Sequence, residues 1–331
     1  MPEMTSLQAL RESAVVLDGV RHDVLRATGN DRQTFLQRIT SGTIASKTAG
    51  QGGRTLLLDV RGRVLASLLA FVRARSVRLL VAAGQGTEVA AGLGKYAIMD
   101  DFQIVVEDEL ATLAILGPQS IDVLTALGVA DVPPLLQAPV FDHAEVPSPF
   151  GPLWLAHGRA CGTDGLCVVA TREARDALVQ ALVDKGVVRL DPALAEALRI
   201  AALEPKVGAE ITPDRFPVEI GLGAAIDHGK GCYVGQETIV RMRDRGIVRK
   251  RLVLLRVTGE STPAAADKIA GPSTPTAGQI TSAAKLPGEA PVALAVLASA
   301  VPVGATVQIE HAGSSIAAEV AAELLPWGQS S

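Results

Sequence analysis

The stretch K-G-C-Y-V-G-Q-E at residues 230–237 is the most informative part of this chain. Gly231 and Gly235 bracket a cysteine–tyrosine pair, and glycine allows a positive φ or a close approach of the backbone to a ligand. Lys230 lies two residues before Cys232, and a nearby ammonium favours the thiolate, the reactive form of cysteine. The octet therefore predicts a tight turn that carries a functional thiol. The structural alternative is a cysteine that only fills space in the core.

The composition indicates a folded protein in a reducing compartment. With 331 residues, 48% of them hydrophobic, the chain can build two domains or three compact subdomains around a large core. The net charge of −4 argues against wholesale binding to nucleic acid or to an anionic membrane. Three cysteines, an odd number, suit the cytoplasm better than a disulfide scaffold. We expect a cytoplasmic protein without a signal peptide or a membrane span.

The histidines and the other two cysteines do not suggest a metal centre. The five histidines are scattered along the chain and form no metal-binding pair. Cys161 and Cys167 are six residues apart in C-G-T-D-G-L-C, which is not the C-x-x-C spacing. We expect them on a glycine-containing hairpin, in a structural role.

The order of the predicted elements favours an α+β protein with mainly antiparallel sheets. Alternating apolar residues at 55–59 and 64–72 predict a β-hairpin around R-G-R at 61–63. Amphipathic helices are predicted at 174–185 and 192–203. Strands and hairpins followed by helices, without a regular βαβ rhythm, are typical of the α+β class.

The C-terminal part of the chain follows a different, all-β pattern. Residues 258–278 are rich in Thr, Pro, Ala and Gly, which predicts a loop or linker. Short strands are then predicted at 279–283, 292–297, 306–310 and 316–321, a pattern compatible with a small β-barrel. We therefore expect one domain over 1–250, built from two subdomains, and a C-terminal β-barrel domain over 251–331.

The octet resembles the signature of the YgfZ family, folate-binding proteins with the aminomethyltransferase fold that are linked to iron–sulfur cluster maintenance. Further stretches resemble motifs of that family, in the family's order: G-N-D at 29–31 with F-L-Q-R-I-T at 35–40, L-D-V-R-G-R-V at 58–64, L-G-P at 116–118, L-R-I at 198–200, P-V-E at 217–219 and G-Q-I-T-S at 278–282. The resemblance implies an aminomethyltransferase-like folate-binding body and a C-terminal β-barrel. It also implies tetrahydrofolate or a derivative as the bound ligand, with no tightly bound metal.

Polar residues in these motifs and the arginines that follow the octet are candidate folate contacts, because a pterin needs a carboxylate and its tail needs cations. They are Arg199, Glu219, Tyr233, Gln236, Glu237 and Arg241. The carboxylates of Glu219 and Glu237 are candidates to accept two N–H donors of the pterin. Arg199, Arg241 and Arg243 are candidate cations for the benzoyl-glutamate tail, because the guanidinium binds carboxylates through two parallel hydrogen bonds.

The chain departs from related patterns at two places. The family pattern L-R-I-E-A-G reads L-R-I-A-A-L at 198–203, so Ala201 replaces a glutamate, for which Glu204 could substitute. Aminomethyltransferases carry an acid–base aspartate in G-G-x-x-D-D on the early hairpin, where this chain has Ala66 and Ser67. Losing a positioned acid–base group typically costs about 10²- to 10⁴-fold in rate. We therefore expect the fold without aminomethyl turnover.

A run of arginines follows the octet. Arg241, Arg243 and Arg245 alternate, so an extended chain would set them on one face, where they could rim an anionic pocket or contact phosphates. Single-stranded nucleic-acid sites usually interleave aromatic side chains with basic ones, and this stretch has none. A rim for the folate tail, or plain surface charge, is therefore favoured over an RNA groove.

These observations predict a folate-binding protein that supports assembly or repair of iron–sulfur clusters and indirectly affects tRNA modification. Its predicted partners are folate and iron–sulfur cluster assembly factors or client enzymes, without a membrane and without direct contact to nucleic acid. Three alternatives stay open. They are a folate-dependent aminomethyl or one-carbon transferase, an RNA-binding module, and a ligand-free scaffold, which Ala201 favours.

Overall fold

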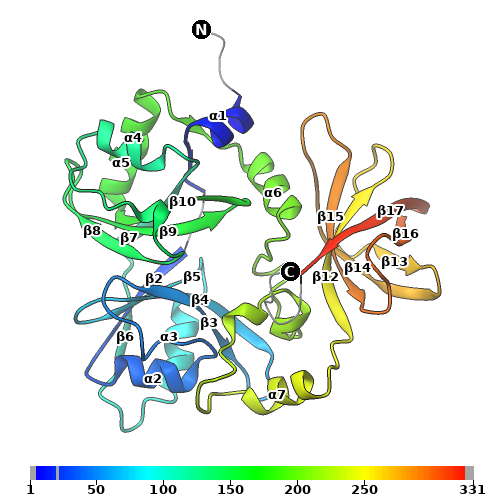
Figure 1. Ribbon diagram of the computed structural model, residues 1–331, viewed down its shortest axis with the longest axis horizontal. Coiled ribbons are helices and arrows are strands. Elements are labelled where there is room, and N and C mark those ends of the chain that lie inside the picture. Colours follow the sequence, from blue (N-terminus) through cyan, green and yellow to red (C-terminus); the bar gives the residue numbers. More distant parts are fainter. Residues whose placement is uncertain (1–4, 20–21, 325–331) are drawn as a thin grey trace. The chain divides into compact units, whose positions relative to one another are not determined.

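The computed structural model describes residues 5–19 and 22–324 (Figure 1). Contacts between residues divide the chain into two compact units. Unit 1 comprises Met1–Leu57, Ala66–Pro192 and Lys230–Tyr233. Unit 2 comprises Leu58–Leu65, Ala193–Gly229 and Val234–Ser331.

The first layer of unit 1 is a six-stranded sheet. Its order is β11 (Val188–Arg189), β1 (Val15–Leu17), β7 (Leu110–Leu116), β10 (Thr163–Thr171), β9 (Leu153–Ala160) and β8 (His143–Val146). Only the β1–β11 pair is parallel among the pairs of this sheet. Helices α4 (Ser120–Ala126) and α5 (Arg172–Asp184) pack on it through a core that includes Leu113, Leu155 and Leu178. The Thr171 hydroxyl caps α5 by accepting from Ala174 N.

The second layer of unit 1 is a five-stranded sheet. Its order is β3 (Gly52–Leu58), β4 (Val64–Val72), β5 (Val77–Ala82), β2 (His22–Thr28) and β6 (Gln103–Val106). Helices α2 (Arg32–Ile39) and α3 (Gly86–Gly94) belong to this layer, and α1 (Ser6–Glu12) precedes β1 (Figure 1). The two sheets share a cluster in which Phe71 lies edge-on to Trp154 at 4.6 Å between ring centroids. This aromatic contact contributes about 0.5–1.5 kcal/mol beyond area burial.

Unit 2 contains a closed antiparallel barrel. Its order is β12 (Lys250–Val257), β15 (Pro291–Ala298), β14 (Thr274–Lys285), β13 (Lys268–Gly271), β16 (Thr306–His311) and β17 (Ser314–Glu323). Val253, Leu255, Ile309 and Val320 point into its core. Closure satisfies both edges of every strand, so the barrel presents no free edge. The other elements of unit 2 are α6 (Pro192–Ala201), α7 (Gln236–Asp244) and the short 3₁₀ turns η2 (Pro217–Glu219) and η3 (Gly223–Ala225).

The predicted fold class is confirmed: the chain is α+β, with mainly antiparallel sheets and a small C-terminal barrel. The linker predicted at 258–278 is wrong in part, because β13 and the start of β14 lie inside it. That stretch lacks apolar alternation. β13 forms nevertheless, because its backbone pairs with β14 on one side and with β16 on the other. The domain boundary between 250 and 251 stays a prediction, since residue contacts group Ala193–Gly229 with the barrel.

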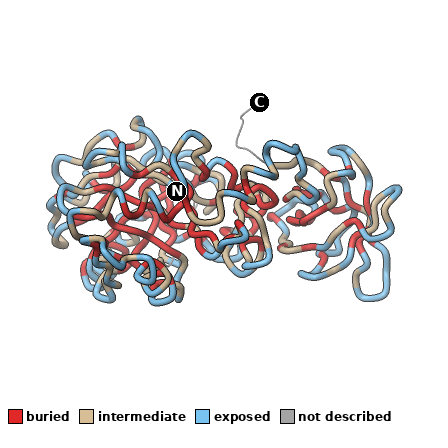
Figure 2. The backbone as a smooth tube through the Cα atoms, turned by 90° about the horizontal axis from the view of Figure 1, so that it is seen from below, coloured by how far each residue is buried: buried red, intermediate tan, exposed pale blue. Residues whose placement is uncertain are grey.

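Burial follows the strands. Strand residues are largely buried, and exposed residues lie mostly in the connections. Figure 2 shows the backbone coloured by this burial. Within residues 5–19 and 22–324, no helix is long and apolar enough to cross a membrane.

Candidate functional site

The first half of the octet is held by Lys230 in unit 1. The Lys230 ammonium donates to Thr40 O at 2.6 Å and to Gly42 O at 2.8 Å, and it lies 5.4 Å from the centroid of the buried Tyr233 ring. Thr40 is the C-cap of α2, where carbonyl groups carry partial negative charge that a cation stabilises. The structure therefore gives Lys230 an anchoring role. Its tuning of Cys232 stays a prediction.

The three cysteines differ in environment. Cys232 is exposed, whereas Cys161 is buried in the turn of the β9–β10 hairpin and Cys167 lies in β10. Burial raises the pKa of the Cys167 thiol to about 12. The hairpin predicted for Cys161 and Cys167 is confirmed, and Cys232 is the exposed thiol. Among the described residues, no group of three or more His, Cys, Asp or Glu could hold a metal ion.

The second half of the octet packs on the β3–β4 turn in unit 2. Gly235 has φ +82°, and a Cβ built there would collide with Asp59 O and lie 3.0 Å from the Gly62 Cα. Gly62 has φ +81°, and its own added Cβ would lie 3.1 Å from Gly235 O. The turn is closed by the Asp59 carboxylate, which accepts from Arg61 N and Arg63 N, both at 2.8 Å. Two of the sequence motifs therefore meet at a contact that only glycine permits on both sides.

The residues after Gly235 form a helix. Gln236 begins α7, and Glu237 lies in its first turn, where a carboxylate favours the helix dipole. Glu237 pairs with Arg241, but their side chains are 84% and 58% exposed, so the pair contributes only about 0.3–0.5 kcal/mol. The extended conformation that would set Arg241, Arg243 and Arg245 on one face is not formed. At 100° per residue, α7 instead separates Arg243 from the other two.

Arg199 is the centre of a buried polar cluster in unit 2. Its Nε and Nη2 donate to the Glu196 carboxylate at 3.0 and 2.7 Å. Its Nη1 donates to Glu204 O and to the fully buried Glu210 carboxylate. Its Nη2 also donates to Ser282 Oγ at 2.9 Å. Desolvation lowers the pKa of Arg199, but the bond to Glu196 and the charge of Glu210 outweigh it and raise the pKa above its usual range. A guanidinium has five N–H donors, and all are used here. Contact between Arg199 and a folate tail stays a prediction, and this geometry favours a structural role.

The cluster brings two motifs that are distant in the sequence into contact in the fold. Ser282 lies in G-Q-I-T-S and donates to Glu210 Oε1 at 2.6 Å, so L-R-I on α6 and the β14 motif meet at one buried carboxylate. Glu210 was not predicted from the sequence, because a single glutamate in a loop carries no periodic signal. Glu204, the predicted substitute for the glutamate absent at Ala201, contributes its backbone carbonyl to Arg199.

Glu219 is the best placed of the predicted pterin carboxylates. It ends η2 and is only 8% exposed. Its Oε2 accepts from Phe216 N at 3.2 Å, and no described residue hydrogen-bonds to Oε1. The structure thus leaves one carboxylate oxygen of Glu219 open, in contrast to the exposed ion pair at Glu237.

Gly235→Ala should destabilise the protein by about 1–3 kcal/mol, because alanine meets both an unfavourable positive φ and the backbone of Asp59. Gly231→Ala is the matched control in the same octet, since a Cβ there has no atom within 4 Å and its φ is not positive. Urea unfolding would measure both variants. Equal stability of the two variants would contradict the glycine contact.

Comparisons with known proteins identify the family and the fold of this chain. The model of the GCVT N-terminal domain family matches residues 4–230, more than half of the chain. The chain is 25% identical over 261 residues to a putative chloroplastic transferase of Arabidopsis thaliana, a match that covers 78% of this chain but only 60% of that relative. It is 25% identical over 262 residues to the aminomethyltransferase of Bacillus subtilis (strain 168), covering 77% of this chain and 72% of that enzyme. The crystal structure of glycine cleavage system aminomethyltransferase T from Bartonella henselae superposes with a TM-score of 0.85 at 24% identity, covering 99% of this chain and 91% of that one. The chain therefore belongs to the GCVT N-terminal domain family and has the aminomethyltransferase fold.

Proposed function

We propose that this protein binds tetrahydrofolate or a derivative and supports the assembly or repair of iron–sulfur clusters through the thiol of Cys232. The observation that carries the proposal is the exposure of Cys232 within a tightly held turn. Lys230 anchors the residues before it, and the Gly235 contact fixes the residues after it. A cysteine that only filled core space would be buried, as Cys161 is.

Family membership and Glu219 support the folate part of the proposal. Several relatives are named aminomethyltransferases, and the resemblance of the motifs implies a folate ligand. The open Oε1 of Glu219 can accept an N–H of a pterin, and the low exposure of the residue would strengthen that hydrogen bond. Since the donors of Arg199 are used, the exposed Arg241 or Arg243 is the better candidate for the glutamate tail. Tyr233, Gln236 and Glu237 stay predicted contacts.

A folate-dependent aminomethyl transferase is the second candidate, favoured by the names of the relatives. The residues of β4 argue against a transferase, because neither the buried Ala66 nor Ser67 can act as a carboxylate acid or base. The nearby Asp59 carboxylate is engaged by the two backbone amides of its own turn. Steady formation of methylenetetrahydrofolate from an aminomethyl-loaded carrier, above a control without protein, would decide for the transferase.

Folinate or tetrahydrofolate at about 100 times its Kd should stabilise the folded protein by about 2.7 kcal/mol. Glu219→Gln should weaken binding by at least about tenfold, because a charged acceptor is replaced by a neutral amide. Glu289→Gln, an exposed site in unit 2, is the matched control and should bind like the wild type. Thermal melts and calorimetry measure both effects. No melting shift and no heat at millimolar ligand would exclude folate binding and leave the bare scaffold.

Cys232→Ala should keep a cooperative melt within a few degrees of the wild type, since exposed substitutions usually change stability by less than about 0.5 kcal/mol. The same variant should fail to restore cluster-dependent tRNA thiolation in cells that lack the gene. Cys161→Ala and Cys167→Ala, where they fold, should restore it. Full restoration by Cys232→Ala would contradict a functional thiol and reduce the octet to a structural loop.

A further inference from the structure

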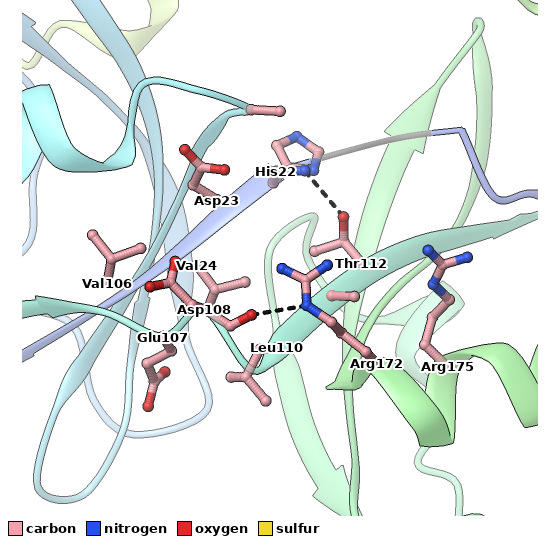
Figure 3. A pocket seen from close by; sticks show the side chains of 12 residues that line it. His22, Asp23, Val24, Val106, Glu107, Asp108, Leu110, Thr112, Arg172 and Arg175 are labelled. Atoms are coloured by element: carbon pink, nitrogen blue, oxygen red, sulfur yellow. Dashed lines mark hydrogen bonds between the residues drawn. The ribbon is translucent and has the colours of Figure 1, made fainter.

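Unit 1 contains a small polar cavity that the proposed function does not use. It lies among the start of β2, the turn between β6 and β7, and the first turn of α5 (Figure 3). Its volume is about 60 Å³. One water needs about 10–15 Å³ of such space, so the cavity has room for a group of on the order of four or five heavy atoms. This is the size of a small ion and far too small for a pterin.

Two of the three acidic residues in the lining, Asp23 and Glu107, are already bound by protein donors. Asp23 Oδ2 accepts from Gly84 N at 2.9 Å and Gly86 N at 2.7 Å, at the start of α3. Glu107 accepts from Arg26 at 2.8 Å and from Arg78 at 3.2 Å. The carboxylates of Asp23 and Glu107 are therefore satisfied, whereas Asp108, the third acidic residue of the lining, is exposed to solvent.

The donor side of the lining has open capacity. Arg172 uses its Nε for Asp108 O at 2.9 Å, and no described residue accepts from its two terminal nitrogens. Figure 3 shows its guanidinium between Asp108 and Thr112. Arg175 places its Nε out of contact with solvent and without a partner among the described residues, while its Nη1 reaches the exposed Asp176. Both arginines lie in the first turn of α5, where the helix dipole also favours negative charge.

His22 closes the cavity near the start of β2. Its Nδ1 is shielded from solvent and has no hydrogen-bond partner among the described residues. Burial, with a further effect from the charge of Arg54, lowers the pKa of His22 to about 4, so the imidazole is neutral at pH 7. Buried polar atoms without partners cost free energy and commonly mark a missing water, ion or ligand.

We propose that this cavity binds a small oxyanion, a carboxylate or a phosphate group, held by Arg172 and Arg175. Arg172 and Arg175 supply unfilled donors, His22 Nδ1 can donate in one tautomer, and a ligand that accepts hydrogen bonds would satisfy all three. Two guanidinium groups beside a helix N-terminus suit a planar carboxylate or a phosphate in particular. The site is made of unit 1 residues alone and is distinct from the predicted folate contacts.

The test titrates inorganic phosphate and, separately, acetate into the full-length protein, with sodium chloride holding the ionic strength constant. Calorimetry and thermal melts should show saturable binding of at least one of the two anions. The double variant Arg172→Gln/Arg175→Gln should weaken that binding by at least about tenfold. Arg159→Gln removes one positive charge from an exposed site on β9 and should leave binding unchanged. Tighter binding of phosphate would indicate a phosphate ligand, and tighter binding of acetate would indicate a carboxylate ligand.

A second variant keeps the test decisive if the double variant does not fold. Ala83 is an exposed residue at the rim of the cavity, so Ala83→Leu should narrow the entrance while both arginines remain. Loss of saturable binding in Ala83→Leu would support the site. Saturable binding that survives in either variant, or stabilisation by sodium chloride equal to that by both anions, would overturn it. Neither result bears on folate, since folate binding is measured with Glu219→Gln.

Discussion

The organisation of unit 2 depends on one buried charge, the guanidinium of Arg199. It donates to Glu196, Glu204, Glu210 and Ser282 and so ties α6, the following loop and β14 together. Glu210 is fully buried, and removing one partner of a buried ion pair usually costs about 3–5 kcal/mol, because the other charge is left uncompensated. The pair therefore constrains where α6 lies on the barrel, and the bond to Glu196 keeps the pKa of that carboxyl low.

A second constraint sets the conformation of the octet. Gly62 and Gly235 both have positive φ, a Cβ added at Gly235 would collide with Asp59 O, and one added at Gly62 would lie 3.1 Å from Gly235 O. On the other side, Lys230 satisfies carbonyl groups at the end of α2. Between these two attachments, Cys232 is exposed while its neighbour Tyr233 is buried.

The sequence predicted the fold class and the motif positions well, because these rest on apolar periodicity and on short turn signals. It placed α5 and α6 within two residues and predicted four of the six barrel strands, missing β12 and β13. It could not predict that Arg199 is saturated by Glu210 and Ser282, since partners 11 and 83 residues away meet only in three dimensions. Alternating arginines suggested an extended segment where α7 forms, because alternation of charge alone does not specify a strand. The cavity beside His22 carries no sequence motif at all.

The central claim is that the fold presents one thiol and protects the other two. The most direct measurement is the rate at which iodoacetamide alkylates each cysteine in the native protein. Mass spectrometry follows the reaction of each cysteine separately. We expect Cys232 to react at the rate of an open thiol. Cys161, which is buried, should react at least about 10³-fold more slowly, through unfolding, because buried groups in a stable domain become accessible mainly when it opens. Cys167 is only partly buried, but the raised pKa of its thiol, about 12, should also make it react more slowly than Cys232. Equal rates for all three cysteines, or protection of Cys232, would contradict the central claim.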